Sequence, residues 1–381
     1  MNIRMKRKVY VSTPSRICLF GEHQDYLGLE VIASAINLRF YASATDREDS
    51  LIRIRIRDER LNYLGVKNSQ GLYETETIDI SKPIVYENNR DYLKSTVNLL
   101  LKSGYPIKHG FDITMDSEIP IGKGMSSSTT MIVVLTKLLL EMIDSPDKDN
   151  AEKIALLGFK AEVEEFKEPG GMMDHYTSAL GGLVHLKFNE TTEVSRINRT
   201  IPGSFILFDS MERKNTTKVL ADAKYPVISA LDDLKDVGIS SVRDFYYDED
   251  NLKYLKLLDE TRKTKLMASI DNFRILKEAE ALIKGYSFSP EVFGELLKKH
   301  HANLRDGLGI STPTIENILD TAYANGALGG KVNGSGGGGC AYVYAYDEDC
   351  DRIIKAVADL GYPGRVMKQD SGVRKDKEEI I

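Results

Sequence analysis

The chain has few cysteines and no regular arrangement of them. Its 381 residues include three, Cys18, Cys340 and Cys350, an odd and widely spaced set. Such a set does not form a disulfide framework, and a chain of this length does not need one to stabilise its core. The cysteine content is typical of a reducing compartment, and we expect the cytoplasm.

Long hydrophobic runs are also missing. The longest, residues 131–143, contains Lys137 and Glu141 and is shorter than the roughly 20 residues that a transmembrane helix needs. The basic residues 4–8 are followed by neither the apolar region nor the small-residue cleavage site of a signal peptide. The sequence predicts a buried helix at residues 131–143 and no membrane association.

Positive charge is not in excess. The chain has 51 Lys and Arg against 57 Asp and Glu, which gives a net charge of −6. Proteins that bind a nucleic-acid backbone cluster Lys and Arg, and those that bind single strands add exposed aromatic side chains. The composition therefore disfavours a nucleic-acid partner.

The remaining composition is that of a globular protein, with 42% hydrophobic and 28% charged residues. A chain of 381 residues is longer than one hydrophobic core usually grows. We therefore expect two lobes, residues 1–201 and 202–381, with a boundary near Pro202 and a ligand site in the cleft between them.

Strand-like and helix-like segments are mixed along the chain, which predicts an α+β fold. A polar turn is expected at residues 62–70, and the charged tail at residues 374–379 is expected to be frayed. Strands are expected at residues 8–12, 30–44, 51–57, 111–115 and 205–208, and helices at residues 151–166 and at several places between 225 and 304.

A glycine- and serine-rich loop at residues 120–128 lies between an expected strand and the expected buried helix. Its sequence is PIGKGMSSS, in which Gly122 and Gly124 allow backbone N–H groups to point into one concavity. The serine hydroxyls add donors, and the following helix presents its N-terminus to anions. The loop predicts a phosphate site, although it lacks the ending of a Walker A loop. An ordinary capped helix start is the alternative.

A second motif, PSRICLFGEHQDY at residues 14–26, concentrates charged and polar side chains. Arg16, Glu22, His23 and Asp25 form a hydrogen-bonding set suited to a polyol such as a sugar. The alternative is a charged surface turn.

Two further motifs contain glycine clusters. In KEPGGMMDHY, residues 167–176, a glycine pair precedes Asp174, whose carboxylate would accept a proton from a substrate hydroxyl or cap a helix. In GGKVNGSGGGGCAYVYAY, from Gly329, a glycine turn runs into a strand. A flexible linker is the alternative for the last motif.

Taken in order, the four motifs resemble those of the GHMP kinase superfamily and, within it, the galactokinases. Arg16 stands six residues before Glu22, as in galactokinases, and residues 224–227 and 296–313 are similar to further galactokinase segments. The resemblance covers nearly the whole chain. It implies a two-lobed α+β fold, with an N-terminal lobe like domain 2 of ribosomal protein S5, a ferredoxin-like C-terminal lobe and the active site between them.

The resemblance also implies roles for individual residues. Asp174 is the expected catalytic carboxylate and Arg16 its partner. The expected sugar-binding residues are Glu22, His23, Asp25, Gly171 and Tyr225. Those expected to bind ATP are Gly122, Lys123, Gly124, Met125, Ser126, Ser127, Ser128, Gly334, Ser335 and Gly336. Ser128 and Glu162 are expected to hold Mg²⁺, with Glu164 and Glu165 as rivals of Glu162.

The implied reaction is ATP-dependent phosphorylation of the anomeric hydroxyl of a monosaccharide, with galactose as the expected substrate. Departures from the galactokinase pattern at Ser15, Cys18, residues 27–29 and His175 surround the expected sugar pocket and leave the sugar open. The alternatives are a kinase for a uronic acid, N-acetylgalactosamine or a heptose, and a sugar- and ATP-sensing regulator without turnover. We expect a monomer or weak homodimer.

Overall fold

The computed structural model describes residues 6–57, 73–120, 123–168, 170–188, 192–213 and 215–381. The turn expected at residues 62–70 lies outside these ranges, as do Gly122 and Pro169. Within the described ranges, no helix has both the length and the apolar character to cross a membrane.

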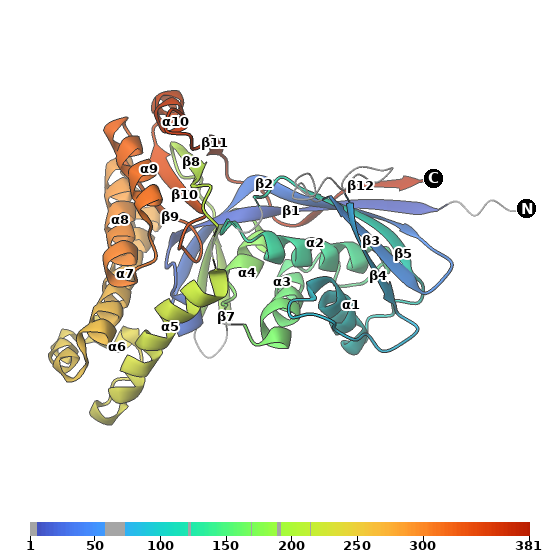
Figure 1. Cartoon of the computed structure of the whole chain (residues 1–381), viewed down its shortest axis with the longest axis horizontal. Helices are drawn as coiled ribbons and strands as arrows, with labels where there is room; N and C mark the ends of the chain where they lie inside the picture. Colours follow the sequence, from blue (N-terminus) through green and yellow to red (C-terminus); the bar gives the residue numbers. More distant parts are fainter. Residues whose placement is uncertain (1–5, 58–72, 121–122, 169, 189–191, 214) are drawn as a thin grey trace, which may run out of the picture.

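A sheet of eight strands forms the larger layer of the molecule (Figure 1). Its main path runs β12-β1-β2-β5-β3-β4, while β6 pairs with β2 and β7 with β6. The strands are β1 (Arg7–Phe20), β2 (Val31–Asp46), β3 (Leu51–Arg57), β4 (Tyr73–Asp79), β5 (Phe111–Ser117), β6 (Leu183–Phe188), β7 (Thr192–Ile197) and β12 (Arg374–Ile380).

Among the described residues, four helices lie on one side of this sheet (Figure 1). They are α1 (Tyr92–Lys102), α2 (Ser127–Met142), α3 (Ala151–Phe159) and α4 (Met173–Leu180). Helices α2 and α4 contact the strands, and α1 and α3 pack on these helices. Helix α2 contacts β1 and β2 and is buried along almost its whole length, as its apolar sequence predicts. A π-helical turn, Lys160–Glu164, continues α3 within the helix expected at residues 151–166.

A second, antiparallel sheet has the order β11-β8-β10-β9 and is surrounded by the C-terminal helices (Figure 1). Its strands are β8 (Ser204–Asp209), β9 (Gly329–Val332), β10 (Cys340–Ala345) and β11 (Gly364–Met367). The helices of this part are α5 (Thr216–Asp233), α6 (Val242–Tyr247), α7 (Glu260–Lys284), α8 (Pro290–Ala302), α9 (Pro313–Ala324) and α10 (Cys350–Ala358).

The prediction of a frayed C-terminal tail is wrong. Residues 374–380 form β12, an edge strand that pairs antiparallel with β1 from Arg7↔Ile380 to Ser12↔Arg374. The charge density suggested fraying, but charged side chains are typical of edge strands, where they oppose pairing with other chains. Here they also form ion pairs, such as Arg7 with Glu378 at 3.0 Å.

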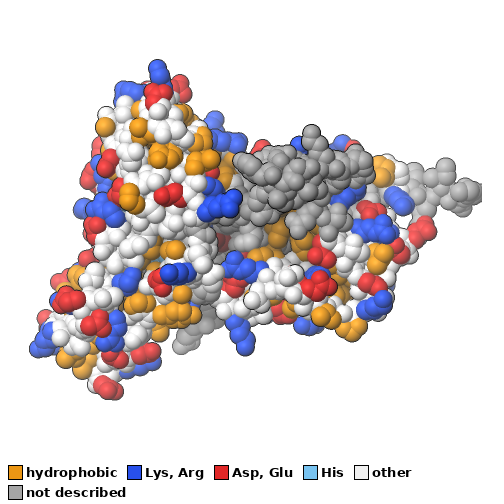
Figure 2. All heavy atoms as spheres, viewed as in Figure 1, with side chains coloured by type: hydrophobic (Ala, Val, Ile, Leu, Met, Phe, Trp, Pro, Cys, Tyr) orange, Lys and Arg blue, Asp and Glu red, His pale blue; other side chains and the backbone are white. Residues whose placement is uncertain are grey.

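The expected α+β fold of two lobes is confirmed, because each sheet has its own set of helices. The first strand of the smaller sheet begins at Ser204, close to the expected boundary at Pro202, although β12 returns to the larger sheet. On the face shown in Figure 2, acidic and basic side chains are interspersed over the described surface.

Candidate active site

A cavity of about 450 Å³ lies where the motifs meet. Segments of both lobes line it. They include β1, the start of α2, the π-helical turn, the start of α4 and the glycine turn after β9. The predicted site residues that line it are Arg16, Glu22, His23, Asp25, Gly124, Ser126, Ser127, Ser128, Glu162, Gly171, Asp174, Gly334 and Ser335.

An ion pair between Arg16 and Asp174 lies in the cavity wall. Arg16 Nε donates to Asp174 Oδ1 at 2.6 Å, and Nη2 donates to Oδ2 at 2.7 Å. Arg16 is on β1 and its side chain is 4% exposed, whereas the side chain of Asp174, in the first turn of α4, is 25% exposed. The carboxylate is therefore accessible to a ligand while its partner is fixed from behind.

The surroundings of Asp174 keep its carboxylate ionised. Burial opposes the charged form, but the charge and hydrogen bonds of Arg16 and a hydrogen bond from Ser126 outweigh it and lower the pKa of Asp174. Ser126 adopts φ 55° just before α2, a conformation that is uncommon for a residue other than glycine. This backbone places the Ser126 hydroxyl against Asp174 and connects the serine-rich loop to the expected catalytic carboxylate.

Asp25 lies beside Asp174 in the cavity and belongs to residues 14–26, the expected sugar motif. Its carboxylate accepts hydrogen bonds from the backbone of Tyr26 and Met173. Burial and the negative charge of Asp174 raise the pKa of Asp25 to about 6. A Cβ on Gly171 would lie 2.0 Å from Asp25 Oδ2, so a side chain there would displace this carboxylate.

A buried lysine that the sequence did not single out holds the next carboxylate. Lys331, on β9, is fully buried, and its Nζ donates to Glu22 Oε2 at 2.7 Å. The same oxygen accepts the backbone N–H of Gly334 at 3.1 Å. A buried lysine is rare unless it is paired. The sequence signal was a lysine inside an otherwise glycine-rich and apolar strand.

His23 connects the sugar motif to the glycine turn. Its Nε2 lies 3.1 Å from the carbonyl oxygen of Ser335, and its Nδ1 lies 2.7 Å from the hydroxyl oxygen of Tyr26. Tyr26 also lines the cavity. The two contacts fix the imidazole ring from both sides.

The serine-rich loop and the glycine turn pack directly on one another. Gly334 has φ 74°, and a Cβ there would lie 2.5 Å from the carbonyl oxygen of Gly124. The same oxygen accepts from Arg16 Nη1 at 3.0 Å and from Asn333 Nδ2 at 3.1 Å. The expected phosphate loop is thus supported by the glycine turn, which explains the requirement for small residues there.

Some predicted ligands point elsewhere. Among the described residues, Lys123, Met125, Gly336 and Tyr225 do not line the cavity. Lys123 instead pairs with Asp209 at 2.9 Å, Met125 is fully buried, and Tyr225 is 57% exposed on α5. Tertiary packing decided these directions, because neighbouring loop residues point to different sides.

Glu162 lies at the cavity wall in the π-helical turn, an irregularity that is frequent at functional sites. Its carboxylate accepts from the Thr129 hydroxyl at 2.8 Å, and His175 Nε2 lies 2.8 Å from the same oxygen. Its rivals Glu164 and Glu165 are not among the lining residues, and Glu165 instead accepts from Tyr86 at 2.6 Å. Ser128, at the start of α2, lines the same cavity.

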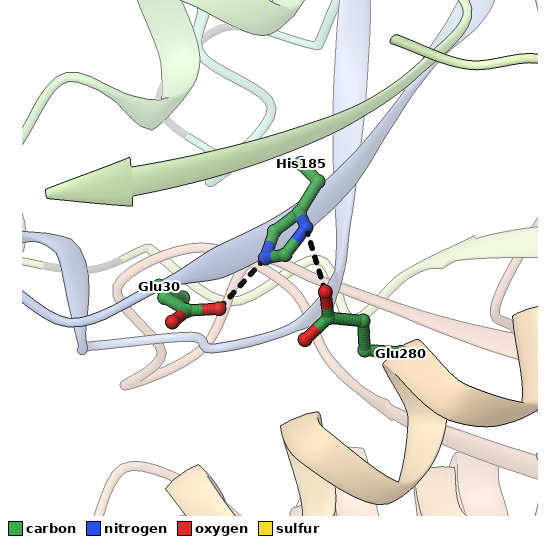
Figure 3. Close-up of side chains that lie close together, drawn as sticks. All are labelled: Glu30, His185 and Glu280. Carbon is green, nitrogen blue, oxygen red and sulfur yellow. Dashed lines mark hydrogen bonds and ion pairs between the residues drawn. The ribbon is translucent and has the colours of Figure 1, made fainter. Parts of the chain in front are cut away.

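A second cluster with metal-ligand spacing lies outside the cavity (Figure 3). His185 Nε2 is 2.9 Å from Glu30 Oε2, and His185 Nδ1 is 3.4 Å from Glu280 Oε1. Among the described residues, it is the one group of His, Cys, Asp and Glu that meets this spacing. Lys277 and Lys284 donate to the same carboxylates, so positive charge is already present where an ion would bind. No motif in the sequence predicted this cluster.

Three family models match the chain. The GHMP kinase N-terminal domain matches residues 91–182, the GHMP kinase C-terminal domain matches residues 279–363, and the galactokinase galactose-binding signature matches residues 4–45. The chain belongs to the GHMP kinases. This confirms the resemblance drawn from the four motifs.

Individual GHMP kinases match over most of their length. A galactokinase of Clostridium perfringens strain SM101 is 29% identical over 358 residues, 91% of this chain and 87% of the relative. A mevalonate kinase of Pyrococcus abyssi is 28% identical over 341 residues, 90% of each chain. The crystal structure of Lactococcus lactis galactokinase complexed with galactose superposes with a TM-score of 0.80 at 22% identity, covering 97% of this chain and 95% of that one.

Proposed function

We propose that this GHMP kinase transfers the γ-phosphoryl group of ATP to the anomeric hydroxyl of galactose. The galactose-binding signature supports this substrate, because it spans Arg16, Glu22 and Asp25, all of which line the cavity. The observation that carries the proposal is the Arg16–Asp174 pair. It lies between the carboxylates of the sugar motif and the serines at the start of α2.

Asp174 orients the sugar hydroxyl and accepts its proton. Its lowered pKa makes it ionised at neutral pH but a weak base. Phosphoryl transfer tolerates a weak base because its transition state is loose, so the nucleophile needs little deprotonation before the new bond forms. Arg16 keeps the carboxylate in place and contributes positive charge at the reacting centre.

The nucleotide phosphates are proposed to bind at the N-terminus of α2. Ser127 and Ser128 begin this helix and line the cavity, where backbone N–H groups and the helix dipole favour anions. Gly124 leaves the backbone of the preceding loop accessible at the same wall.

Ser128 and Glu162 are the residues proposed to hold Mg²⁺. A hydroxyl and a carboxylate at one cavity wall are the oxygen donors that Mg²⁺ prefers, and they fit this ion. When bound, Mg²⁺ would neutralise phosphate charge. The hydroxyl of Thr129 donates to the Glu162 carboxylate and orients it, and His175 lies beside the same oxygen.

A panel of acceptors tests the substrate. ADP release is measured with galactose, galacturonate, glucuronate, N-acetylgalactosamine, a heptose and mevalonate, and we expect the highest kcat/KM with galactose. Mevalonate belongs in the panel because one relative is a mevalonate kinase. Preference for another acceptor would overturn galactose as the substrate, and binding of sugar and ATP without ADP release would indicate a regulator. A monomeric or weakly dimeric state and a cytoplasmic location stay predictions.

A further inference from the structure

An arginine at the edge of the cavity is held by a carboxylate from a distant part of the chain. Arg90 Nε lies 2.9 Å from Glu168 Oε1, and Nη2 donates to Glu168 Oε2 at 2.9 Å. The same Nη2 lies 3.2 Å from the hydroxyl of Thr217, and the hydroxyl of Tyr92 donates to Glu168. Arg90, Tyr92 and Glu168 all line the cavity. The group joins α1, the segment before Gly170 and the first turn of α5.

Arg90 has an unusual backbone conformation. Its φ of 73° is in the left-handed region, which is uncommon for a residue other than glycine. The turn is held by Asp91, whose carboxylate accepts the backbone N–H groups of Glu87 and Asn88 at 2.6 and 3.0 Å. Unfavourable backbone conformations that persist are characteristic of functional positions.

Arg90 is on the phosphate side of the cavity. Helix α1 begins two residues after it, and Ser95 of that helix donates to the carbonyl of Ala161 at 2.8 Å, in the π-helical turn that carries Glu162. The negative charge of Glu162 contributes to the raised pKa of Tyr92, after burial and the hydrogen bond to Glu168. Arg90 therefore stands near the end of the cavity where phosphates and Mg²⁺ are proposed to bind.

Of the two arginines among the described lining residues, Arg90 is the one free to change partner. Arg16 is 4% exposed at its side chain and is held by Asp174, whereas the Arg90 side chain is 44% exposed. The guanidinium fork binds carboxylates and phosphates in the same bidentate geometry. An incoming polyphosphate therefore competes directly with Glu168.

We propose that Arg90 exchanges Glu168 for the polyphosphate of the nucleotide when the nucleotide binds. Arg90 is then a nucleotide-binding residue, and Glu168 fixes its side chain at the cavity before the nucleotide binds. Glu168 competes with the phosphates for Arg90, and its negative charge also opposes their approach. This inference rests on the proposed use of ATP.

Opposite effects of two substitutions test the exchange. The affinity for a non-hydrolysable ATP analogue is measured by titration calorimetry for the wild type, Arg90→Gln, Glu168→Gln and a control, Arg274→Gln. Arg274 forms a similar pair with Glu249 on the surface of α7, and its removal should leave affinity unchanged. We expect Arg90→Gln to weaken binding about tenfold, the value of one charge-assisted hydrogen bond, and Arg90→Lys to restore part of it. We expect Glu168→Gln to leave binding unchanged or to strengthen it.

Two outcomes would overturn the exchange. Equal weakening by Arg90→Gln and Glu168→Gln would show that the pair only supports the local structure. Unchanged analogue affinity in Arg90→Gln, with a raised KM for the sugar, would assign Arg90 to the sugar instead. Because analogue binding requires no sugar and no turnover, the result stands even where the choice of galactose as acceptor fails.

Discussion

Two charged clusters of this kinase use the same kinds of side chains for different ends. In the cavity, Asp174 is 25% exposed and its carboxylate has room beside it for a ligand. In the second cluster, His185 is fully buried between Glu30 and Glu280 (Figure 3). Access, and not the presence of charge, separates a reacting site from a supporting one.

The two clusters also differ in their balance of acidic and basic side chains. Acidic side chains outnumber arginines among the described cavity residues, so that end of the molecule can accept a cation. In the second cluster, Lys277 donates to both carboxylates, at 3.2 and 2.7 Å, and Lys284 donates to Glu280 at 2.8 Å. These contacts join α7 to β6 and to Glu30, the residue before β2, so the cluster stabilises the arrangement of the two lobes.

The largest effect should come from Asp174→Asn. Removing the group proposed to accept the proton should lower kcat about 10²- to 10⁴-fold, because proton transfer by a positioned side chain contributes that much. ADP release measures turnover, and thermal unfolding checks the fold.

Asp370→Asn provides a matched control for that substitution. Asp370 pairs with Arg39 at 2.7 Å, with side-chain exposures of 21% and 4% that nearly equal those of the Asp174 pair. The Asp370→Asn variant should be less stable than the wild type while keeping turnover within about twofold. Near-normal turnover in Asp174→Asn, with sugar still bound, would remove Asp174 from the catalytic role.

A smaller effect should appear in the pH dependence of sugar use. With a pKa of about 6, Asp25 is ionised at pH 7 and becomes protonated as the pH falls, so the proposed hydrogen bond from a sugar hydroxyl loses its charge assistance. We expect kcat/KM for galactose to fall about tenfold per pH unit below pH 6. Steady-state rates from pH 5 to 8 measure this.

The control is Asp25→Asn, which should be less active and lack this limb of the profile. Glu280 remains ionised throughout the range, because its pKa is lowered to about 2. The contribution of Glu280 to stability should therefore stay constant over the pH range in which activity changes. A wild-type profile that is flat from pH 7 to 5 would contradict the role of Asp25.

Glu280→Gln should affect stability and not turnover. Burial opposes ionisation of Glu280, but hydrogen bonds from Lys277 and Lys284 lower its pKa from 4.5 to about 2. Stability from this ionised group is present above pH 4.5 and is lost as the pH falls towards 2. Since the group is partly exposed, we expect Glu280→Gln to lower the free energy of unfolding by about 1 kcal/mol at pH 7. Urea unfolding at pH 7, 5 and 3 should show the difference from wild type shrinking. The control is Glu278→Gln, on the same helix and exposed.

Zinc should have the smallest effect. The two carboxylates are already paired with Lys277 and Lys284, so an incoming cation would have to displace these lysines. Adding Zn²⁺ should leave Tm within about 1 °C, in line with a site that gains no binding energy. A rise in Tm that disappears in His185→Gln would instead make the cluster a metal site.

The family and several charged side chains that line the cavity were predictable from local sequence. Arg16, Glu22, Asp25 and Asp174 occur in short motifs whose spacing survives folding, and all four line the cavity. Lys331 was missed because its one local signal, a lysine within an otherwise glycine-rich and apolar strand, does not show that it pairs with Glu22, 309 residues away.

Side-chain direction within a motif was not predictable. Ser126, Ser127 and Ser128 line the cavity while Lys123 pairs with Asp209, although all belong to one loop. The positive φ of Ser126 and its bond to Asp174 set these directions, and neither is visible in the sequence.

The sequence by itself determined the family, the α+β class and the motifs that supply carboxylates, an arginine and a glycine- and serine-rich loop, because these depend on residue type and short spacing. Only the tertiary structure decided which side chains share the cavity, that Glu168 holds Arg90, and that the charged tail forms β12. Those outcomes depend on contacts between segments far apart in the chain, where burial and pairing of charge outweigh local preference.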